Sequence, residues 1–323
     1  MSIESRPEKG AGGVPDVPAG RHDGLPGHEP ALQGGGTVHG EQVSSLRRGF
    51  RVFAENRLAL LGLGIVLFFV LFCFAGPLIY HTDQVHTNLL VSNEAPSSSH
   101  VLGTDPTGYD ELGRLMYGGQ ASLEVGITAA VLATIVGTLY GAVSGYVGGF
   151  LDSVMMRLVD GALAIPSLFI LLVLSTIYSP STLSMIIIIA LFSWLVAARL
   201  VRGEALSLRT REYVQAVKVM GGGGTRAVIR HIAPNAIGTM VVFATFTVAD
   251  SIILLSALGY LGLGIQPPQT DWGGMLSQAI NYINSGYWWL LYPPGVAILL
   301  VCIAFNFMGD ALRDAFEVRL QRR

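Results

Sequence analysis

The chain has 323 residues, of which 51% are hydrophobic and only 13% are charged. Soluble globular domains usually carry about 25% charged residues, so this composition and the mean hydropathy of +0.53 indicate a membrane protein. The net charge of −2 gives no reason to expect a nucleic-acid partner. Both cysteines lie in apolar runs, so we expect neither a disulfide framework nor a metal site.

The N-terminal 45 residues are rich in Gly, Pro, Glu and His and contain few aromatic residues. Such a segment cannot bury enough apolar surface to offset its ordering entropy, so residues 1–45 are predicted to form a disordered tail. Residues 46–57 mix four arginines with apolar side chains. They suit a short helix lying in the membrane interface, although a simple basic flank of the first span explains them equally well.

Six stretches with little or no charge predict an all-α fold with six transmembrane helices, within residues 58–310. A helix rises ~1.5 Å per residue, so about 20 residues cross the ~30 Å apolar core of a bilayer. Pro166 predicts a kink or a late helix start in the third span. A charged tail, residues 311–323, follows the last span. The predicted spans are 58–80, 123–146, 162–177, 183–200, 237–264 and 287–307.

Basic residues predict how the chain is oriented. Residues 46–57, the segment 202–235 and the C-terminal tail hold most of the arginines, whereas the loops on the opposite side hold only Arg114. Positive charge marks the cytoplasmic side, so both termini and the segment 202–235 are expected in the cytoplasm. Four aromatic residues at the other end of the sixth span are expected to form an interfacial belt: Tyr287, Trp288, Trp289 and Tyr292.

The segment 202–235 is the most informative part of the chain. Residues 204–220 lack Gly and Pro and have helix-compatible spacing. The glycine run 221–224 permits a sharp turn, and Thr225 suits the N-cap of a second short helix. The spacing therefore predicts a helix-turn-helix protrusion that could dock into a groove of a soluble partner, with an ordinary basic loop as the alternative.

This segment resembles the signature loop of ABC-importer permeases, which reads Glu-Ala-Ala, three residues, Gly, then about nine residues to Ile-x-Leu-Pro. Gln215 replaces the usual Glu, and Ala233 replaces the usual Leu. Further motifs are similar to the C-type subunits of the dipeptide, oligopeptide and nickel branch, and the resemblance covers about residues 46–320. These motifs lie at His100–Asp105, Gly113–Gly118, Asp152–Ser167 and Gly259–Leu276.

The resemblance implies a type I importer permease in the bacterial inner membrane, paired there with a homologous B-type permease subunit. Two ATPase subunits, or one fused ATPase chain, would bind ATP and Mg, and an extracytoplasmic binding protein would deliver the substrate. Peptides are the expected substrates, with nickel chelates or another small solute as alternatives. Contacts with the ATPases would involve Glu212, Tyr213, Gln215, Ala216, Gly221, Gly222 and Pro234.

The chain itself is not expected to be an enzyme or to bind a cofactor. Its only lysines, Lys9 and Lys218, do not lie in the Gly-x-x-x-x-Gly-Lys-Ser/Thr loop that holds nucleotide phosphates. A stand-alone secondary transporter would need intramembrane charge relays and internal repeats, and an intramembrane hydrolase would need paired acids, a serine dyad or histidine ligands. No clear repeat or such constellation is apparent, which favours the importer permease.

Asp250 lies midway in the fifth span, where a carboxylate costs ~2.5–3.5 kcal/mol on insertion scales. It is expected either to hydrogen-bond a neighbouring helix or to face the translocation path and contact a cationic substrate terminus. The family often has Glu where this chain has Leu255, but the two positions lie on different helix faces. Elsewhere, the spacing of Arg157 and Asp160 predicts a local ion pair.

Overall fold

The computed structural model describes residues 53–211 and 233–320. The predicted tail 1–45, most of the segment 46–57 and residues 212–232 lie outside these ranges. All the described residues belong to one structural unit, Val43–Arg323.

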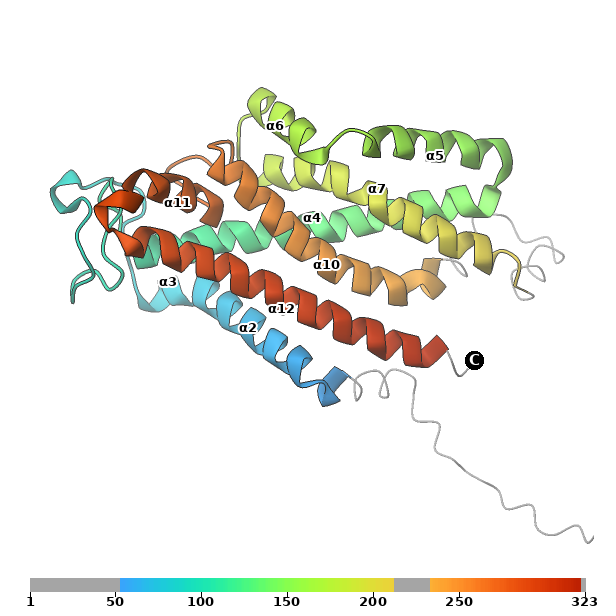
Figure 1. The fold of residues 1–323 in the computed structure, drawn as a ribbon, viewed down its shortest axis with the longest axis horizontal. Coiled ribbons are helices and arrows are strands. Elements are labelled where there is room, and N and C mark those ends of the chain that lie inside the picture. The colour runs from blue at the N-terminus through green and yellow to red at the C-terminus, as the bar shows by residue number, and fades with distance from the viewer. Residues whose placement is uncertain (1–52, 212–232, 321–323) are drawn as a thin grey trace, which may run out of the picture. The chain divides into compact units, whose positions relative to one another are not determined.

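The described residues fold into helices, with one isolated β-bridge between Thr104 and Asp110 (Figure 1). Five helices are long and apolar enough to cross a membrane, and a bent pair, α5 and α6, makes six when counted as one crossing. This agrees with the predicted all-α, six-span fold. The elements are α2 (Arg57–Phe74), α3 (Gly76–Ile79), η1 (Leu89–Val91), α4 (Glu111–Val147), α5 (Gly149–Leu163), α6 (Ser167–Ile177), α7 (Thr182–Leu208), α10 (Ala233–Tyr260), α11 (Trp272–Ala279), η3 (Ile280–Ser285) and α12 (Trp288–Leu320).

The first predicted span is one helix followed by a short second helix. The Asn56 side chain caps α2 by accepting hydrogen bonds from the backbone N–H groups of Leu58 and Ala59. Arg57 therefore begins the span rather than ending the segment before it. The helix breaks at Ala75, and Pro77 lies in the first turn of α3, where its missing N–H is tolerated.

The second span begins twelve residues before its predicted start at residue 123, because α4 already starts at Glu111. Glu111 and Arg114 indicate a loop when read as sequence, but both are only 3% exposed. The Arg114 guanidinium donates to the backbone carbonyl of Pro268, 2.7 Å away. The Pro268 carbonyl and the Asp105 carboxylate, 3.8 Å away, thus compensate the charge of Arg114 and let the helix extend beyond its apolar part.

The third span is not the single helix predicted over residues 162–177. The chain instead forms two helices, α5 and α6, whose axes differ by 81°. Gly148, with φ +68°, ends α4 and allows α5 to begin at once, in a segment predicted to be a loop. Pro166 directly precedes α6 and has no N–H to continue a helix, which accounts for the break.

The remaining spans agree with the prediction in position but not always in length. α7 and α10 include the predicted spans, except that α10 ends at Tyr260 rather than at residue 264. α12 continues to Leu320, well past the predicted membrane exit at residue 307. The C-terminal segment that was expected to follow the span is therefore largely a continuation of the same helix.

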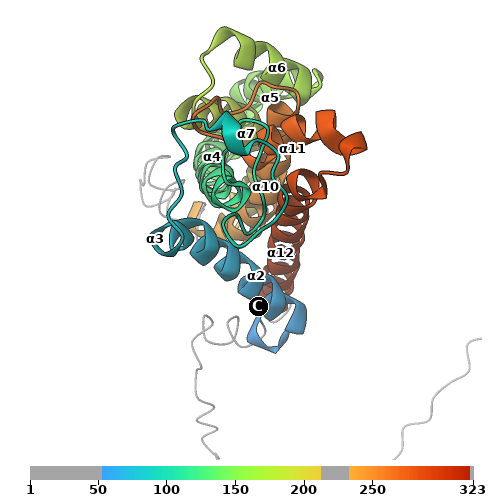
Figure 2. The same ribbon diagram turned by 90° about the vertical axis from the view of Figure 1, so that its left-hand side faces the viewer.

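α4 and α10 lie in the middle of the bundle, with α5 and α6 on one side and α2 on the other (Figure 2). Glycines of α4 bring α7 very close: a Cβ on Gly137 would lie 2.4 Å from the Ala197 Cβ, and one on Gly141 would lie 2.3 Å from the Ala198 carbonyl oxygen. Small residues at such crossings are the usual basis of helix association in membranes.

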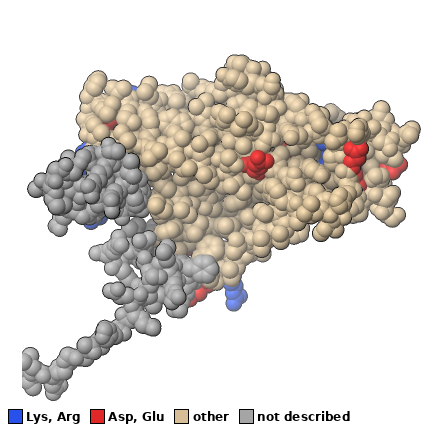
Figure 3. Space-filling model, turned by 180° about the vertical axis from the view of Figure 1, so that it is seen from behind, with Lys and Arg blue, Asp and Glu red and all other residues tan. Residues whose placement is uncertain are grey.

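The surface of the bundle is mostly uncharged. Seen from behind, only scattered acidic and basic side chains interrupt it (Figure 3). Large apolar residues such as Phe68, Val173 and Leu299 are more than half exposed. A soluble protein would not leave so many exposed, whereas in a bilayer they face lipid or a partner chain.

Candidate translocation and coupling sites

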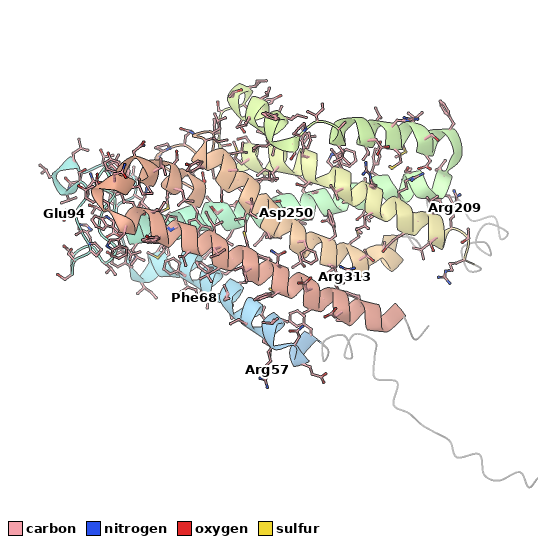
Figure 4. The ribbon with its side chains drawn as sticks, viewed as in Figure 1. Arg57, Phe68, Glu94, Arg209, Asp250 and Arg313 are labelled. Carbon is pink, nitrogen blue, oxygen red and sulfur yellow. The ribbon has the colours of Figure 1, made fainter. Side chains whose placement is uncertain are left out.

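Asp250 lies about midway along α10 (Figure 4). Its side chain is exposed at the surface of the chain and forms no hydrogen bond or ion pair with any described residue. The hydrogen bond to a neighbouring helix that the sequence allowed is therefore absent within the described ranges. A carboxylate at this depth is too costly to face lipid, so its surroundings in the membrane must be water, substrate or another chain.

Leu255 and Asp250 lie on different faces of α10, as the sequence indicated. Leu255 is 0% exposed and packs in a core cluster with Val125, Leu171 and Met185. A carboxylate in that cluster would be enclosed by apolar side chains. Asp250 therefore occupies a different environment and does not substitute for a family Glu at position 255.

A groove with a volume of 340 Å³ lies between α4 and α10 on another face. Its lining comes from Val131 to Leu139 of α4 and from Ile237 to Ala244 of α10. The lining is apolar apart from two threonines, and the Thr134 hydroxyl already donates to the carbonyl of Ala130 in its own helix. The groove does not include Asp250, so it offers no charged group to a substrate.

Six of the predicted ATPase-contact residues, Glu212 to Gly222, lie outside the described residues. The seventh, Pro234, is the second residue of α10, in a first turn that tolerates proline. The segment 212–232 leaves from the end of α7 and returns at the start of α10. We call this end of the bundle the basic end, because Arg199, Arg202, Arg209 and Arg211 lie there.

At the basic end, a buried carboxylate joins three helices. Asp152, in the first turn of α5, accepts two hydrogen bonds from the Arg202 guanidinium of α7, at 2.6 and 2.7 Å. The Ser144 hydroxyl of α4 donates a third, at 2.5 Å. The sequence singled out Asp152 as part of a family motif, but it did not reveal Arg202 as its partner 50 residues away.

The predicted ion pair between Arg157 and Asp160 is wrong. Asp160 instead pairs with Arg199 of α7, at 2.5 Å. Both groups of this pair are about half exposed, at 56% and 55% of the side chain. The i,i+3 spacing allowed a local pair, but antiparallel packing of α5 on α7 brings a closer arginine.

The opposite end of the bundle, which we call the α11 end, is organised by Asp110. One carboxylate oxygen caps α4 by accepting from the Gly113 N–H, and the other accepts from the Tyr80 hydroxyl at 2.8 Å. The same oxygen lies 2.9 Å from Nδ1 of His100. Nearby, the backbone N–H groups of His86 and Val85 and the His86 side chain lower the pKa of Asp83 to about 2.

Asp271 connects α10 to α11. Its two carboxylate oxygens accept hydrogen bonds from the N–H groups of Gly274 and Ile265, at 3.0 and 2.9 Å. Gly259 and Gly264 make room for it, because a Cβ on either would lie within 2.5 Å of a carboxylate oxygen. Burial raises the pKa of Asp271 to about 6, against the lowering effect of these hydrogen bonds.

The expected aromatic belt is only partly formed. Trp288 and Tyr292 are 52% and 61% exposed, as an interfacial belt requires. Trp289, by contrast, is 6% exposed, and its indole N–H donates to the Thr104 carbonyl at 3.3 Å. This residue therefore fastens α12 to the segment preceding α4.

Comparison with known proteins identifies the family. Residues 112–322, more than half of the chain, match the family described as binding-protein-dependent transport system inner membrane component. The chain belongs to this family. Residues 44–96 match a second family, the N-terminal TM domain of oligopeptide transport permease C. The first match begins within α4 and ends just after α12, and it includes the segment 212–232.

Named relatives support the same assignment for this inner membrane component. The chain is 36% identical to the dipeptide transport system permease protein DppC of Bacillus subtilis, over 88% of this chain and 89% of the relative. It is 42% identical to the oligopeptide transport system permease protein OppC of Escherichia coli, over 83% and 89%. A putative peptide permease protein of Brucella suis is 38% identical, over 85% and 92%.

Proposed function

We propose that this chain is one of two permease subunits of an ATP-driven importer for di- or oligopeptides. The match to the inner membrane component family, which runs from α4 to the end of α12, carries this proposal. Similarity to dipeptide and oligopeptide permeases over more than four fifths of the chain supports a peptide as the substrate. Half of the translocation path would come from this chain and half from a homologous B-type subunit.

Energy for transport would come from partner chains. The sequence has no phosphate-binding lysine loop, so ATP and Mg would be bound by two ATPase subunits or one fused ATPase chain. An extracytoplasmic binding protein would deliver the peptide. The family match and the bacterial relatives support an inner-membrane location, and the distribution of arginines supports an orientation with the basic end and both chain termini in the cytoplasm.

Coupling would occur through the segment 212–232. This segment joins α7 to α10, so a force applied to it acts directly on two of the long membrane helices. Closure of the ATPases would draw the segment toward its counterpart in the second permease, and the helices would rock. The cavity would then alternate between the two sides of the membrane.

Asp250 would face this cavity and contact the cationic amino terminus of the peptide. Its carboxylate is exposed in the middle of α10 and forms no hydrogen bond or ion pair with any described residue, so a charged or hydrated partner is required. A cavity between the two permease subunits would supply water when empty and an ammonium group when loaded.

Reconstitution tests the proposal. The chain, its co-purifying permease, ATPases and binding protein are placed in proteoliposomes, and uptake of radiolabelled di- and oligopeptides is measured with and without ATP. We expect uptake only with ATP and the binding protein. Uptake that proceeds without an ATPase would refute the importer assignment, and ATP-dependent uptake of a nickel chelate but no peptide would refute the substrate class.

A further inference from the structure

The contact of Asp152 with Arg202 has the geometry of a mechanical link. A guanidinium that donates two parallel hydrogen bonds to one carboxylate fixes the relative orientation of both groups. The side chain of Asp152 is 9% exposed and that of Arg202 is 33% exposed, so little water competes for the contact. Ser144 adds a third helix, because its hydroxyl donates to the same carboxylate.

The link lies next to the segment proposed to receive force. Arg202 is less than two turns from Leu208, the last residue of α7. Beside Arg202, Val201 and Ala205 of α7 pack in a buried cluster with Ala236 and Met240 of α10. The last turns of α7 are thus joined to α4 and α5 through the Arg202–Asp152 contact and packed on α10 by small apolar side chains.

Apolar side chains also join the broken span to α7, but they lie farther from the basic end than the ion pair. Met156 and Val159 of α5 cluster with Leu195 and Ala198 of α7, and Leu171 of α6 clusters with Met185 of α7. α6 buries only Leu171 and Ser175. In α5, Phe150 is 85% exposed and Leu158 is 66% exposed. The 81° bend between α5 and α6 separates them into two short helices. Apolar side chains can slide past one another, whereas the two parallel hydrogen bonds of the ion pair fix the orientation of α5 on α7.

We infer that the Asp152–Arg202 ion pair is a positioning contact that makes the α5–α6 span move with α7 when ATP is consumed. This inference rests on the proposed function. Both residues act through the helices that they join and need not touch the peptide. Loss of the pair would leave α7 free to respond to the ATPases while α5 and α6 lag behind, so hydrolysis would continue with less transport.

A second ion pair between the same helices provides a matched control. Asp160 and Arg199 also join α5 to α7, but both side chains are about half exposed and only one hydrogen bond connects them. No third helix takes part in that contact among the described residues. Ion pairs of this exposed kind contribute little, so Asp160→Asn should leave coupling nearly intact.

The test measures peptide moved per ATP hydrolysed by the complete importer in proteoliposomes. Asp152→Asn and Arg202→Gln should each lower this ratio about tenfold, while the complex still co-purifies and still hydrolyses ATP. The double variant should be no worse than the worse single variant, because both remove one contact. Asp152→Glu, which keeps the carboxylate, should recover most of the ratio.

Several results would overturn the inference. These are an unchanged ratio in Asp152→Asn, an equal fall in Asp160→Asn, or single effects that multiply in the double variant. If Asp152→Asn does not assemble, Arg202→Lys decides, because it keeps the charge and loses the two-pronged contact; an unchanged ratio there refutes the link. A wild-type importer that moves no peptide with ATP would instead refute the proposed function itself.

Discussion

The α4–α7 pair and the α5–α6 pair belong to the same bundle but differ in how closely their helices pack. α4 and α7 approach until a Cβ on Gly141 would lie 2.3 Å from a carbonyl oxygen of α7. α5 and α6 are short, bent by 81° and largely exposed. The first pair is held by close backbone packing along its length. The second is held on α7 by a few buried side chains, such as Val159 and Leu171, and by two ion pairs toward the basic end.

This difference indicates which substitutions should disturb folding and which should disturb movement of the helices. Close helix packing has little freedom to change gradually, because interiors are as dense as organic crystals. A broken span with exposed apolar faces can exchange its packing contacts at a small cost in free energy. We therefore expect substitutions between α4 and α7 to affect folding, and substitutions of exposed polar groups to affect transport.

Gly141→Ala should produce the largest effect. The added methyl group meets the Ala198 carbonyl and the Arg202 backbone nitrogen, neither of which can move unless the helices separate. The free energy of unfolding should fall by about 3 kcal/mol. Gly161→Ala, in α5, is the matched control: nothing lies within 4 Å of its Cβ, so it should raise stability by up to about 1 kcal/mol. Thermal denaturation in detergent measures the stability of both variants. Equal changes in melting temperature would show that α4 and α7 do not pack more closely than α5 does with its neighbours.

Asp271 lies in the tightly packed connection between α10 and α11, where its ionisation affects stability. Its folded-state pKa of about 6 exceeds the ordinary 3.8, so the folded protein holds this proton more tightly than the unfolded chain. The resulting stabilisation is complete below about pH 4 and is lost as the pH rises through 6, amounting to about 2–3 kcal/mol.

Asp271→Asn tests this sign. Asparagine does not ionise, so the melting temperature of the variant relative to the wild type should rise by several degrees between pH 4 and pH 7. It keeps one oxygen that can accept from Gly274 and loses the acceptor for Ile265, which lowers its stability at every pH. A difference that does not vary with pH would show that burial leaves the carboxyl group at its ordinary pKa.

Asp250→Asn should have a smaller effect, confined to transport. Loss of the charge that would contact the peptide amino terminus should lower uptake about tenfold with little change in melting temperature. Peptides with a blocked, uncharged amino terminus are the matched control, because the substitution should not lower their uptake further. Equal losses for blocked and free peptides would exclude the proposed contact.

Much of this architecture follows from the sequence alone. Runs of apolar residues correctly predicted the positions of α2, α7, α10 and α12, because a helix that crosses a bilayer needs about 20 mostly apolar residues. The start of α4 was missed because burial of Arg114 depends on the carbonyl of Pro268, 154 residues away. Trp289 was assigned to the interface because its partner Thr104 is 185 residues away in sequence.

In the candidate sites too, contacts between residues that are distant in sequence could not be predicted. Hydropathy and charge identified Asp250 as the unusual group in its span, because a single carboxylate in an apolar run can be recognised without knowing the fold. The Asp152–Arg202 contact could not be predicted, because spacing within one helix favoured local pairs such as Arg157 with Asp160. The packing of α5 against α7 decides those partners instead.

The most direct test of alternating access is the accessibility of position 250. The natural cysteines, Cys73 and Cys302, are 0% and 8% exposed, so the chain offers a nearly silent background for thiol labelling. In Asp250→Cys importers, a membrane-impermeant thiol reagent should react from the cytoplasmic side without nucleotide and from the other side when the ATP-bound state is trapped. Labelling from the same side in both states, or from neither, would contradict alternating access of a cavity that contains position 250.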